Sequence, residues 1–332
     1  MIFPVTYTRL LARELELDRG GPEAMLAGTG LTPEALTRLE QQVCEEAQFT
    51  IVRNVIRLSG GTAFGLRWGS HLHVTAHGAL GMLIASSPTL GDAMRNLERF
   101  DTVRGEFTHI SRRMDQGFLV MELGLNMPLD EVGMFFMEAL VATVQEYIRL
   151  LLGRWMTEGS IELGYDAPAH AERYPEYLHC PYRFGASGTR VLIPQRLLDL
   201  PNPLSDAEAH DQALLRCEEV QAAQRLAQGW RQQVAVLIRR RIGHLPTLQE
   251  AAGQLGVSTR TLMRHLKVEG TNYQALLDEE LGRQGKQLLA SPRHTVESVA
   301  LALGYREVSA FRRAFRRWFG ISPSEYRQRQ LH

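Results

Sequence analysis

One pattern occurs twice near the C-terminal end of the chain: a helix, a tight turn at a glycine, and a second helix with arginines on one face. The first copy runs from Pro246 to Gly270 and turns at Gly256, and the second runs from His294 to Arg327 and turns at Gly304. The repeat predicts two small helical units in tandem, each of which offers one arginine-bearing helix to a partner.

The second helix of the first copy has an inner and an outer face. Thr247 and Glu250 have the spacing of a capping box at the start of the first helix, and Ser258 is a good N-cap for the second. Leu262 and Leu266 lie one turn apart and predict the inner, packed face. The outer face carries Arg260, Met263, Arg264 and Lys267.

The second helix of the second copy divides in the same way. Its inner face carries Phe311, Ala314, Phe315 and Trp318, and its outer face carries Ser309, Arg312, Arg313 and Arg316. The planar fork of arginine can bind guanine O6 and N7 together, or a phosphate, in two hydrogen bonds. A single arginine-rich face is as readily an ordinary solvated surface, but two such faces in tandem, each behind its own glycine turn, favour DNA binding.

These residues resemble the AraC/XylS-type transcriptional regulators, whose DNA-binding domain has two helix-turn-helix units joined by a long helix. The resemblance rests on the runs AAGQLGVSTRTLMRHLKVEG and VALALGYREVSAFRRAFRRWFG and on the closing ISPSEYR with Pro323. It implies base contacts by Arg260, Met263 and Arg264 from the first unit and by Ser309, Arg312 and Arg313 from the second. It also implies phosphate contacts, which position a protein without reading sequence, by Thr259, Lys267 and Arg316.

The helix expected to join the two units, from Tyr273 to Ala290, departs from the family pattern. It has Leu281 where the family usually has an arginine, and Gly282 and Gly285 where the family usually has helix formers. A glycine inside a helix costs about 1 kcal/mol relative to alanine. The two glycines therefore raise the question of a bent or yielding helix and an adjustable spacing of the two units.

Charge is divided unevenly along the chain. From Trp230 onward there are 17 Lys and Arg against 8 Asp and Glu, which leaves 20 against 29 in the first 229 residues, because the whole chain has 37 of each. A basic part joined to an acidic part points to nucleic acid as the partner of the basic part, since neutralised phosphates release counterions.

The remaining composition is ordinary for a globular chain of 332 residues, and this length predicts two or three domains. The first residues, MIFPVTYTRLLARELELD, carry charges every few positions and predict neither a signal peptide nor a membrane span, so we expect a cytoplasmic protein. Cys44, Cys180 and Cys217 are far apart and odd in number, which supports neither a disulfide framework nor a four-cysteine zinc site. No cofactor is expected.

The acidic part predicts an α+β domain, with helices that flank a small, mostly antiparallel sheet. Helices are expected at Leu10–Leu17, at Thr32–Phe49, after the N-cap Thr89, at Asp130–Leu152 and at Ser205–Gln228, and a helix at Arg231–Arg241 then opens the basic part. Strands are expected at Glu106–Arg112 and Phe118–Leu125, which form a hairpin, and at Ser160–Tyr165, Tyr182–Phe184 and Thr189–Ile193.

The acidic part also resembles the N-terminal effector and dimerisation domain of the ornithine-utilisation type of AraC regulators, often labelled an arabinose-binding type domain. The matching runs are FGLRWG, GALGMLIASSPTLGDAMRNLERF, YPEYLHCPYRFGA and RVLIPQRLLDLPNP. No run shows a sugar-specific constellation, and members of the family are associated with quite different small molecules. The resemblance therefore implies an effector without naming one.

Two clusters in the acidic part have alternative interpretations. His71, His73 and His77 have a spacing that suits a metal ion, but no carboxylate or cysteine lies nearby in the sequence, and no metal site is assigned. His179 and Cys180 suit a nucleophilic pair, but they precede a proline in an expected loop, and a structural pair fits better.

Several apolar residues suit an effector pocket as well as they suit an ordinary core. They are Phe64, Leu66, Trp68, Met82, Phe135, Phe136 and Met137. An effector carboxylate that meets Arg67 or Arg104 is a conjecture, and no effector contact is assigned.

The sequence thus predicts a multidomain regulator: an α+β effector-binding and dimerisation domain at 1–203, a linker helix at 204–229, and an all-α DNA-binding domain at 230–332 with units at about 247–267 and 295–319. We expect a sequence-specific transcription activator, not an enzyme, that binds double-stranded promoter DNA, a small-molecule effector, RNA polymerase and a second copy of itself, and no membrane. The alternatives are a metal sensor or enzyme-like N-terminal domain fused to a DNA-binding module, and a regulator gated by protein partners without a small ligand.

Overall fold

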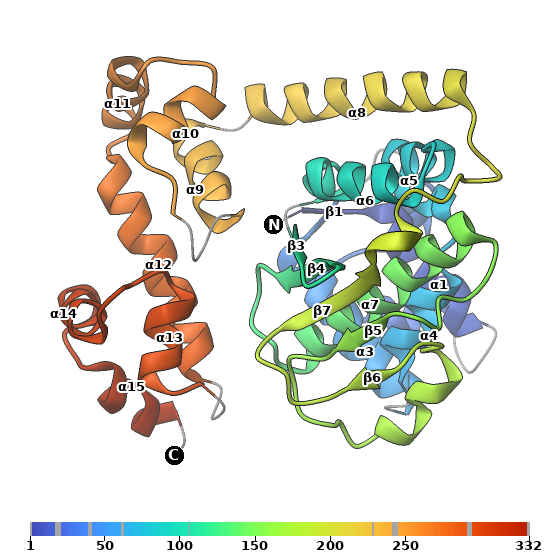
Figure 1. The fold of residues 1–332 in the computed structure, drawn as a ribbon. Coiled ribbons are helices and arrows are strands. Elements are labelled where there is room, and N and C mark those ends of the chain that lie inside the picture. The colour runs from blue at the N-terminus through green and yellow to red at the C-terminus, as the bar shows by residue number, and fades with distance from the viewer. Residues whose placement is uncertain are drawn as a thin grey trace. The chain divides into compact units, whose positions relative to one another are not determined.

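The computed structural model describes residues 2–16, 21–38, 42–60, 63–105, 107–227, 229–240, 245–290 and 294–330. The chain divides into two compact units, Met1–Gln221 and Ala222–His332, here called the N-terminal and the C-terminal unit (Figure 1). Among the described helices, none combines the length and the apolar character needed to cross a membrane.

A five-stranded sheet with flanking helices makes the N-terminal unit an α+β domain, as predicted. The strand order is β3, β4, β7, β5, β6, and every neighbouring pair is antiparallel except β5 and β6. The expected hairpin is present, with Ile110 opposite Leu123. The strands are β3 (Thr108–Asp115), β4 (Phe118–Leu125), β5 (Ser160–Glu162), β6 (Tyr182–Arg183) and β7 (Thr189–Pro194).

Helix α7 (Glu131–Leu152) is the helix that the sequence predicts at Asp130–Leu152; it is largely buried and packs on β4 and on α4 (Phe64–His71). Asp130 caps its first turn by accepting from the N–H groups of Val132 and Gly133 at 3.1 and 3.0 Å. Where α4 crosses α7, a Cβ atom on Gly69 would lie 2.4 Å from the carbonyl oxygen of Ala139. Only glycine therefore allows this close approach of the two backbones.

The N-terminal unit has further helical segments. The α-helices are α1 (Val5–Glu16), α2 (Pro22–Leu26), α3 (Glu45–Ser59), α5 (Gly78–Ser86) and α6 (Leu90–Arg99), and α8 (Ala207–Ala227) extends past the division between the units. The short 3-10 helices are η1 (Pro33–Thr37), η2 (Val74–His77), η3 (Asp101–Arg104), η4 (Ala171–Glu176) and η5 (Gln195–Leu197). Leu17, the last residue of the first helix expected from the sequence, lies outside the described residues.

The prediction of one helix over Thr32–Phe49 is wrong. The structure has η1 there, then a short strand β2 (Gln42–Cys44), and then α3. Thr32 makes no capping hydrogen bond with its side chain. The strand forms because Val43, which is 1% exposed, pairs opposite Phe3 of β1 (Ile2–Pro4) in a two-stranded ladder, so long-range pairing outweighs the local helical pattern.

The C-terminal unit is all helical and contains both helix-turn-helix units. Figure 1 shows α12 running between one group of helices, α9 to α11, and another, α13 to α15. Each group has its own buried core, and the half-buried Leu245 and Leu277 pack against both cores. The helices are α9 (Trp230–Arg240), α10 (Leu248–Gln254), α11 (Thr259–Val268), α12 (Tyr273–Ala290), α13 (Val296–Ala302), α14 (Val308–Phe319) and α15 (Pro323–Gln330).

The two glycines of α12 have a packing role, and the helix is continuous through both of them. A Cβ atom on Gly282 would lie 2.8 Å from Cζ of Phe319, so the ring rests directly on the helix backbone. At Gly285 a Cβ atom would lie 3.6 Å from the rings of Phe311 and Phe315, which is ordinary van der Waals contact. Leu281 is 3% exposed and belongs to the second core. Gly282 thus makes room for the ring of Phe319, and Leu281 contributes to the core.

Candidate nucleic-acid interface and effector pocket

Helix α11 presents the predicted outer face to solvent. Ser258 caps the helix by accepting from the N–H of Thr261 at 3.2 Å, after a left-handed turn at Gly256 with φ of 70°. Leu262 and Leu266 are fully buried and fix the orientation of the helix. Arg260, Met263, Arg264 and Lys267 are exposed, and Thr259 is half-buried.

Helix α14 repeats this arrangement behind a left-handed turn at Gly304, with φ of 85°. Phe311 and Phe315 are fully buried, and their rings meet edge to face with centroids 5.7 Å apart. The ring of Phe315 also contacts that of Phe319, at 4.7 Å. Ser309, Arg312, Arg313 and Arg316 are exposed on the other side of the helix.

The arginines of α14 differ in their partners. Arg312 pairs with Glu297 of α13 at 3.0 Å, and both side chains are more than half exposed. Arg317 holds Asp278 of α12 with two contacts of 3.1 and 3.0 Å, which ties α14 to the joining helix. Within the described part of the chain, no acidic group forms an ion pair with Arg260, Arg264, Lys267, Arg313 or Arg316. Apart from Arg312, the cations of both outer faces thus form no ion pair with the acidic side chains that the structure describes.

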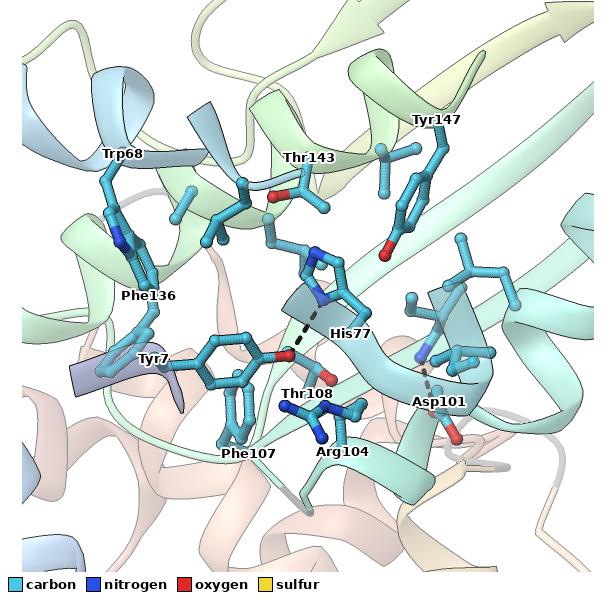
Figure 2. Close-up of a pocket in the computed structure, with 17 residues that line it drawn as sticks. Tyr7, Trp68, His77, Asp101, Arg104, Phe107, Thr108, Phe136, Thr143 and Tyr147 are labelled. Carbon is cyan, nitrogen blue, oxygen red and sulfur yellow. Dashed lines mark hydrogen bonds between the residues drawn. The ribbon is translucent and has the colours of Figure 1, made fainter. Parts of the chain in front are cut away.

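The N-terminal unit contains a cavity of about 80 Å³ between α1, α4, α7 and the start of the sheet (Figure 2). Most of its lining is apolar, and a few polar groups converge on it, as in small-molecule sites. The lining residues are Tyr7, Trp68, Leu72, His77, Leu80, Leu97, Asp101, Arg104, Phe107, Thr108, Ile110, Phe136, Ala139, Leu140, Thr143, Val144 and Tyr147.

A chain of polar contacts runs along one side of the cavity. Arg104 lies with Cζ 5.1 Å from the centroid of the Tyr7 ring, and the Tyr7 hydroxyl is 2.9 Å from Nδ1 of His77. Burial raises the pKa of Tyr7, and the charge and hydrogen bonding of Arg104 oppose this rise. Burial, assisted by the charge of Arg104, lowers the pKa of His77 to about 3, so this imidazole is neutral at pH 7.

Neutral His77 makes the N-terminal unit less stable in acid. The unfolded chain binds a proton at this residue as the pH falls through 6.5, whereas the folded chain binds it only near pH 3, so protons favour unfolding over this window. We expect about 2 kcal/mol of unfolding free energy to be lost between pH 7 and pH 5 through His77. Urea unfolding at both pH values should show this loss in the wild type and in the control His179→Gln, an exposed position. An equal loss in His77→Gln would contradict it.

Only some of the residues proposed from the sequence as pocket lining face the cavity. Trp68 and Phe136 line the cavity, whereas Phe64 and Phe135 line a neighbouring depression beside Glu138 and His170. Met82 is 45% exposed, and Leu66 and Met137 are ordinary core residues. Of the two conjectured arginines, Arg67 pairs with Glu14 at 2.8 Å, and Arg104 lines the cavity.

No sequence pattern marks Tyr7, His77, Thr143 and Tyr147 as pocket residues. These positions come from α1, η2 and α7, and no spacing along the chain connects them. Only the packing of α4 against α7, with α1 beside them, brings the side chains to one cavity.

The three closely spaced histidines have three different partners. His71 contacts Glu14 at 3.0 Å, His73 contacts Thr75 at 3.0 Å, and His77 contacts Tyr7. Among the residues that the structure describes, no three His, Cys, Asp or Glu side chains gather as metal ligands would.

Cys180 and Glu138 are the two groups with potential for nucleophilic or acid chemistry. The thiol of Cys180 is protonated at pH 7, and the carboxyl group of Glu138 is hydrogen-bonded. Burial raises the pKa of Cys180 to about 11, and the ring of His179 instead packs on Trp155, with centroids 3.8 Å apart. Glu138, 2% exposed, is bonded by the Tyr174 hydroxyl at 2.7 Å and lies 2.6 Å from Nε2 of His170. This buried carboxylate therefore ties η4 to α7, a structural contact.

Comparison with known proteins supports a regulator built of these two units. The family model described as the arabinose-binding domain of AraC transcription regulators matches residues 20–202, and a helix-turn-helix domain model matches residues 251–329. The chain is 33% identical over 328 residues to the ornithine utilization regulator of Pseudomonas aeruginosa, which covers 98% of this chain and 96% of that protein.

Two further proteins are similar over nearly the whole chain. An uncharacterised HTH-type transcriptional regulator of Mycobacterium tuberculosis is 31% identical over 333 residues, which cover 98% of this chain and 96% of that protein. The solved structure of the transcriptional regulator CdpR from Pseudomonas aeruginosa is 24% identical with a TM-score of 0.47, over 97% of this chain and 98% of that one.

The family model that covers more than half of the chain and the full-length relatives agree with the paired helix-turn-helix units. The chain therefore belongs to the AraC family of DNA-binding transcription regulators.

Proposed function

We propose that this regulator reads two adjacent major grooves of promoter DNA through its two outer faces. The first reading face is Arg260, Met263 and Arg264 on α11, and the second is Ser309, Arg312 and Arg313 on α14. Thr259, Lys267 and Arg316 contact phosphates beside them. The observation that carries this assignment is the exposure of the six reading residues, Lys267 and Arg316 on two helices that are each anchored by a buried core, with five cations that form no ion pair within the described residues.

We further infer that the regulator acts in the cytoplasm as a homodimer, activates transcription through RNA polymerase, and responds to a small effector in the cavity of the N-terminal unit. The convergence of Tyr7, His77 and Arg104 on a mostly apolar cavity supports an effector site. An effector shifts the regulator between two states only by its different affinity for them. Control by protein partners alone instead predicts that no metabolite raises the melting temperature.

Footprinting on DNA selected by the protein from a random pool tests the two-groove assignment. Each reading helix should protect one major-groove segment, and the two segment centres should lie about one helical turn, roughly 10 base pairs, apart. Binding should weaken steeply with salt, because contacts to phosphates release counterions. A footprint confined to one groove segment would show that only one helix-turn-helix unit contacts DNA.

A further inference from the structure

The cavity of the N-terminal unit offers hydrogen-bond donors at one side and hydrocarbon at the other. Figure 2 shows Arg104, His77 and Thr108 close together, while Trp68 and Phe136 lie toward the opposite side. Because the walls are mostly apolar, the chemistry of the few polar groups decides which kind of ligand fits.

Arg104 provides positive charge at this cavity. Its Nη2 donates to the carbonyl oxygen of Ala76 at 2.9 Å, and its buried Nε has no acceptor in the described structure. No carboxylate among the described residues forms an ion pair with it. A partly buried guanidinium without an anionic partner favours an anion, because charged hydrogen bonds are stronger where water is scarce.

The tautomer of His77 adds a second donor. The Tyr7 hydroxyl lies 2.9 Å from Nδ1 of His77, and we assign the proton of this hydrogen bond to Tyr7, because the guanidinium of Arg104 beside the Tyr7 ring can only donate. The neutral imidazole then carries its own proton on Nε2. This Nε2 is buried without a partner in the described structure, and Figure 2 shows the ring nitrogen that faces away from Tyr7 directed toward Thr143.

The polar groups of the cavity suit an ammonium group less well than an anion. Asp101 is the single carboxylate among the described lining residues, and its Oδ2 already accepts from the backbone N–H of Ile110 at 3.2 Å. The volume of about 80 Å³ has room for roughly five to eight water-sized groups, since one water needs about 10 to 15 Å³. The ligand that fits is small, anionic and mostly hydrocarbon.

We propose that this cavity binds a small organic monocarboxylate, whose carboxylate accepts from Arg104 and whose hydrocarbon body lies against Trp68, Phe136 and Leu140, while Nε2 of His77 is a separate donor in the cavity wall. The proposal rests on effector control through this cavity and names the chemical class of the effector. It places the charge of the ligand beside η3 and its apolar end between α4 and α7.

A matched series of five-carbon compounds tests this class on the full-length protein by calorimetry and melting temperature. Pentanoate should bind, whereas pentanamide, which lacks the charge, and norvaline and ornithine, which add ammonium groups, should bind at least about tenfold more weakly. Arg104→Gln should weaken pentanoate binding by about 10- to 100-fold, while the control Arg154→Gln, at an exposed ion pair with Glu158, should not change it.

Leu140→Trp is a second variant, which fills the cavity and leaves Arg104 in place; it should abolish pentanoate binding while specific DNA is still bound. The monocarboxylate class is overturned if pentanamide, norvaline or ornithine binds as well as pentanoate, if Arg104→Gln binds pentanoate like wild type, or if none of the four compounds binds. In the last case, a melting shift with a metabolite extract in wild type but not in Leu140→Trp would keep an effector at this cavity. If the extract shifts the melting temperature of neither protein, the proposed effector control through this cavity is wrong as well.

Discussion

The double variant Arg264→Ala/Arg313→Ala should lose about 2 to 6 kcal/mol of binding free energy for its specific DNA site, a loss of about 30-fold to more than 10,000-fold in affinity. Each arginine contributes about 1 to 3 kcal/mol if it holds a base edge with two hydrogen bonds. The two losses should add, because α11 and α14 pack in separate cores.

The measurement is a titration of selected DNA and of random DNA at one fixed salt concentration. Both single variants should relax the preference at one base position each, and neither should alter the unfolding transition of the protein. Arg231→Ala is the matched control, because Arg231 is an exposed arginine of the same unit that pairs with Glu279 on α12. If the double variant binds the specific site within twofold of Arg231→Ala, these two arginines do not read the sequence.

A side chain at position 69 should destabilise the N-terminal unit strongly. A Cβ atom there would lie 2.4 Å from the carbonyl oxygen and 2.7 Å from Cα of Ala139, and these are backbone atoms that cannot rotate away. Gly69→Val therefore has to push α4 and α7 apart, and we expect a loss of about 3 kcal/mol or more of unfolding free energy. Because Trp68 and Ala139 line the cavity beside this crossing, ligand binding should be lost as well.

Gly253→Ala is the matched control for this prediction. Gly253 is exposed inside α10, and a Cβ atom there meets nothing within 4 Å. The substitution should stabilise the protein by about 0.5 to 1 kcal/mol, since alanine is the better helix former. Urea unfolding of the full-length chain measures both variants. An unchanged unfolding midpoint in Gly69→Val would mean that the helix crossing is looser than the structure shows.

The C-terminal unit could be predicted closely from the sequence because its signals are local. The capping box of Thr247 and Glu250 is present, with both of its hydrogen bonds. A local signal works in the N-terminal unit too: the helix expected after Thr89 is present, and the Thr89 hydroxyl accepts from the N–H of Asp92 at 3.1 Å. The prediction of a helix at 32–49 is wrong because the decisive contact is not local: Val43 pairs with Phe3, which is far away in the chain.

The cavity could not be predicted for a related reason. In the sequence, His77 is one of three neighbouring histidines, a pattern that suggests a metal site. In the structure its neighbours are Tyr7, from the first helix, and Tyr147, whose ring centroid lies 5.3 Å away. Burial by these distant residues also explains why its pKa falls to about 3, which no local sequence pattern reveals.

The two faces of α14 allow recognition and folding to change independently. Its buried rings hold the helix in place, and its outward residues, such as Arg313, contribute little to that core. Exchanging outward residues should change unfolding free energy by no more than about 0.5 kcal/mol each. A descendant of this chain can therefore acquire a new promoter through a few substitutions, and every intermediate along that route remains a folded protein.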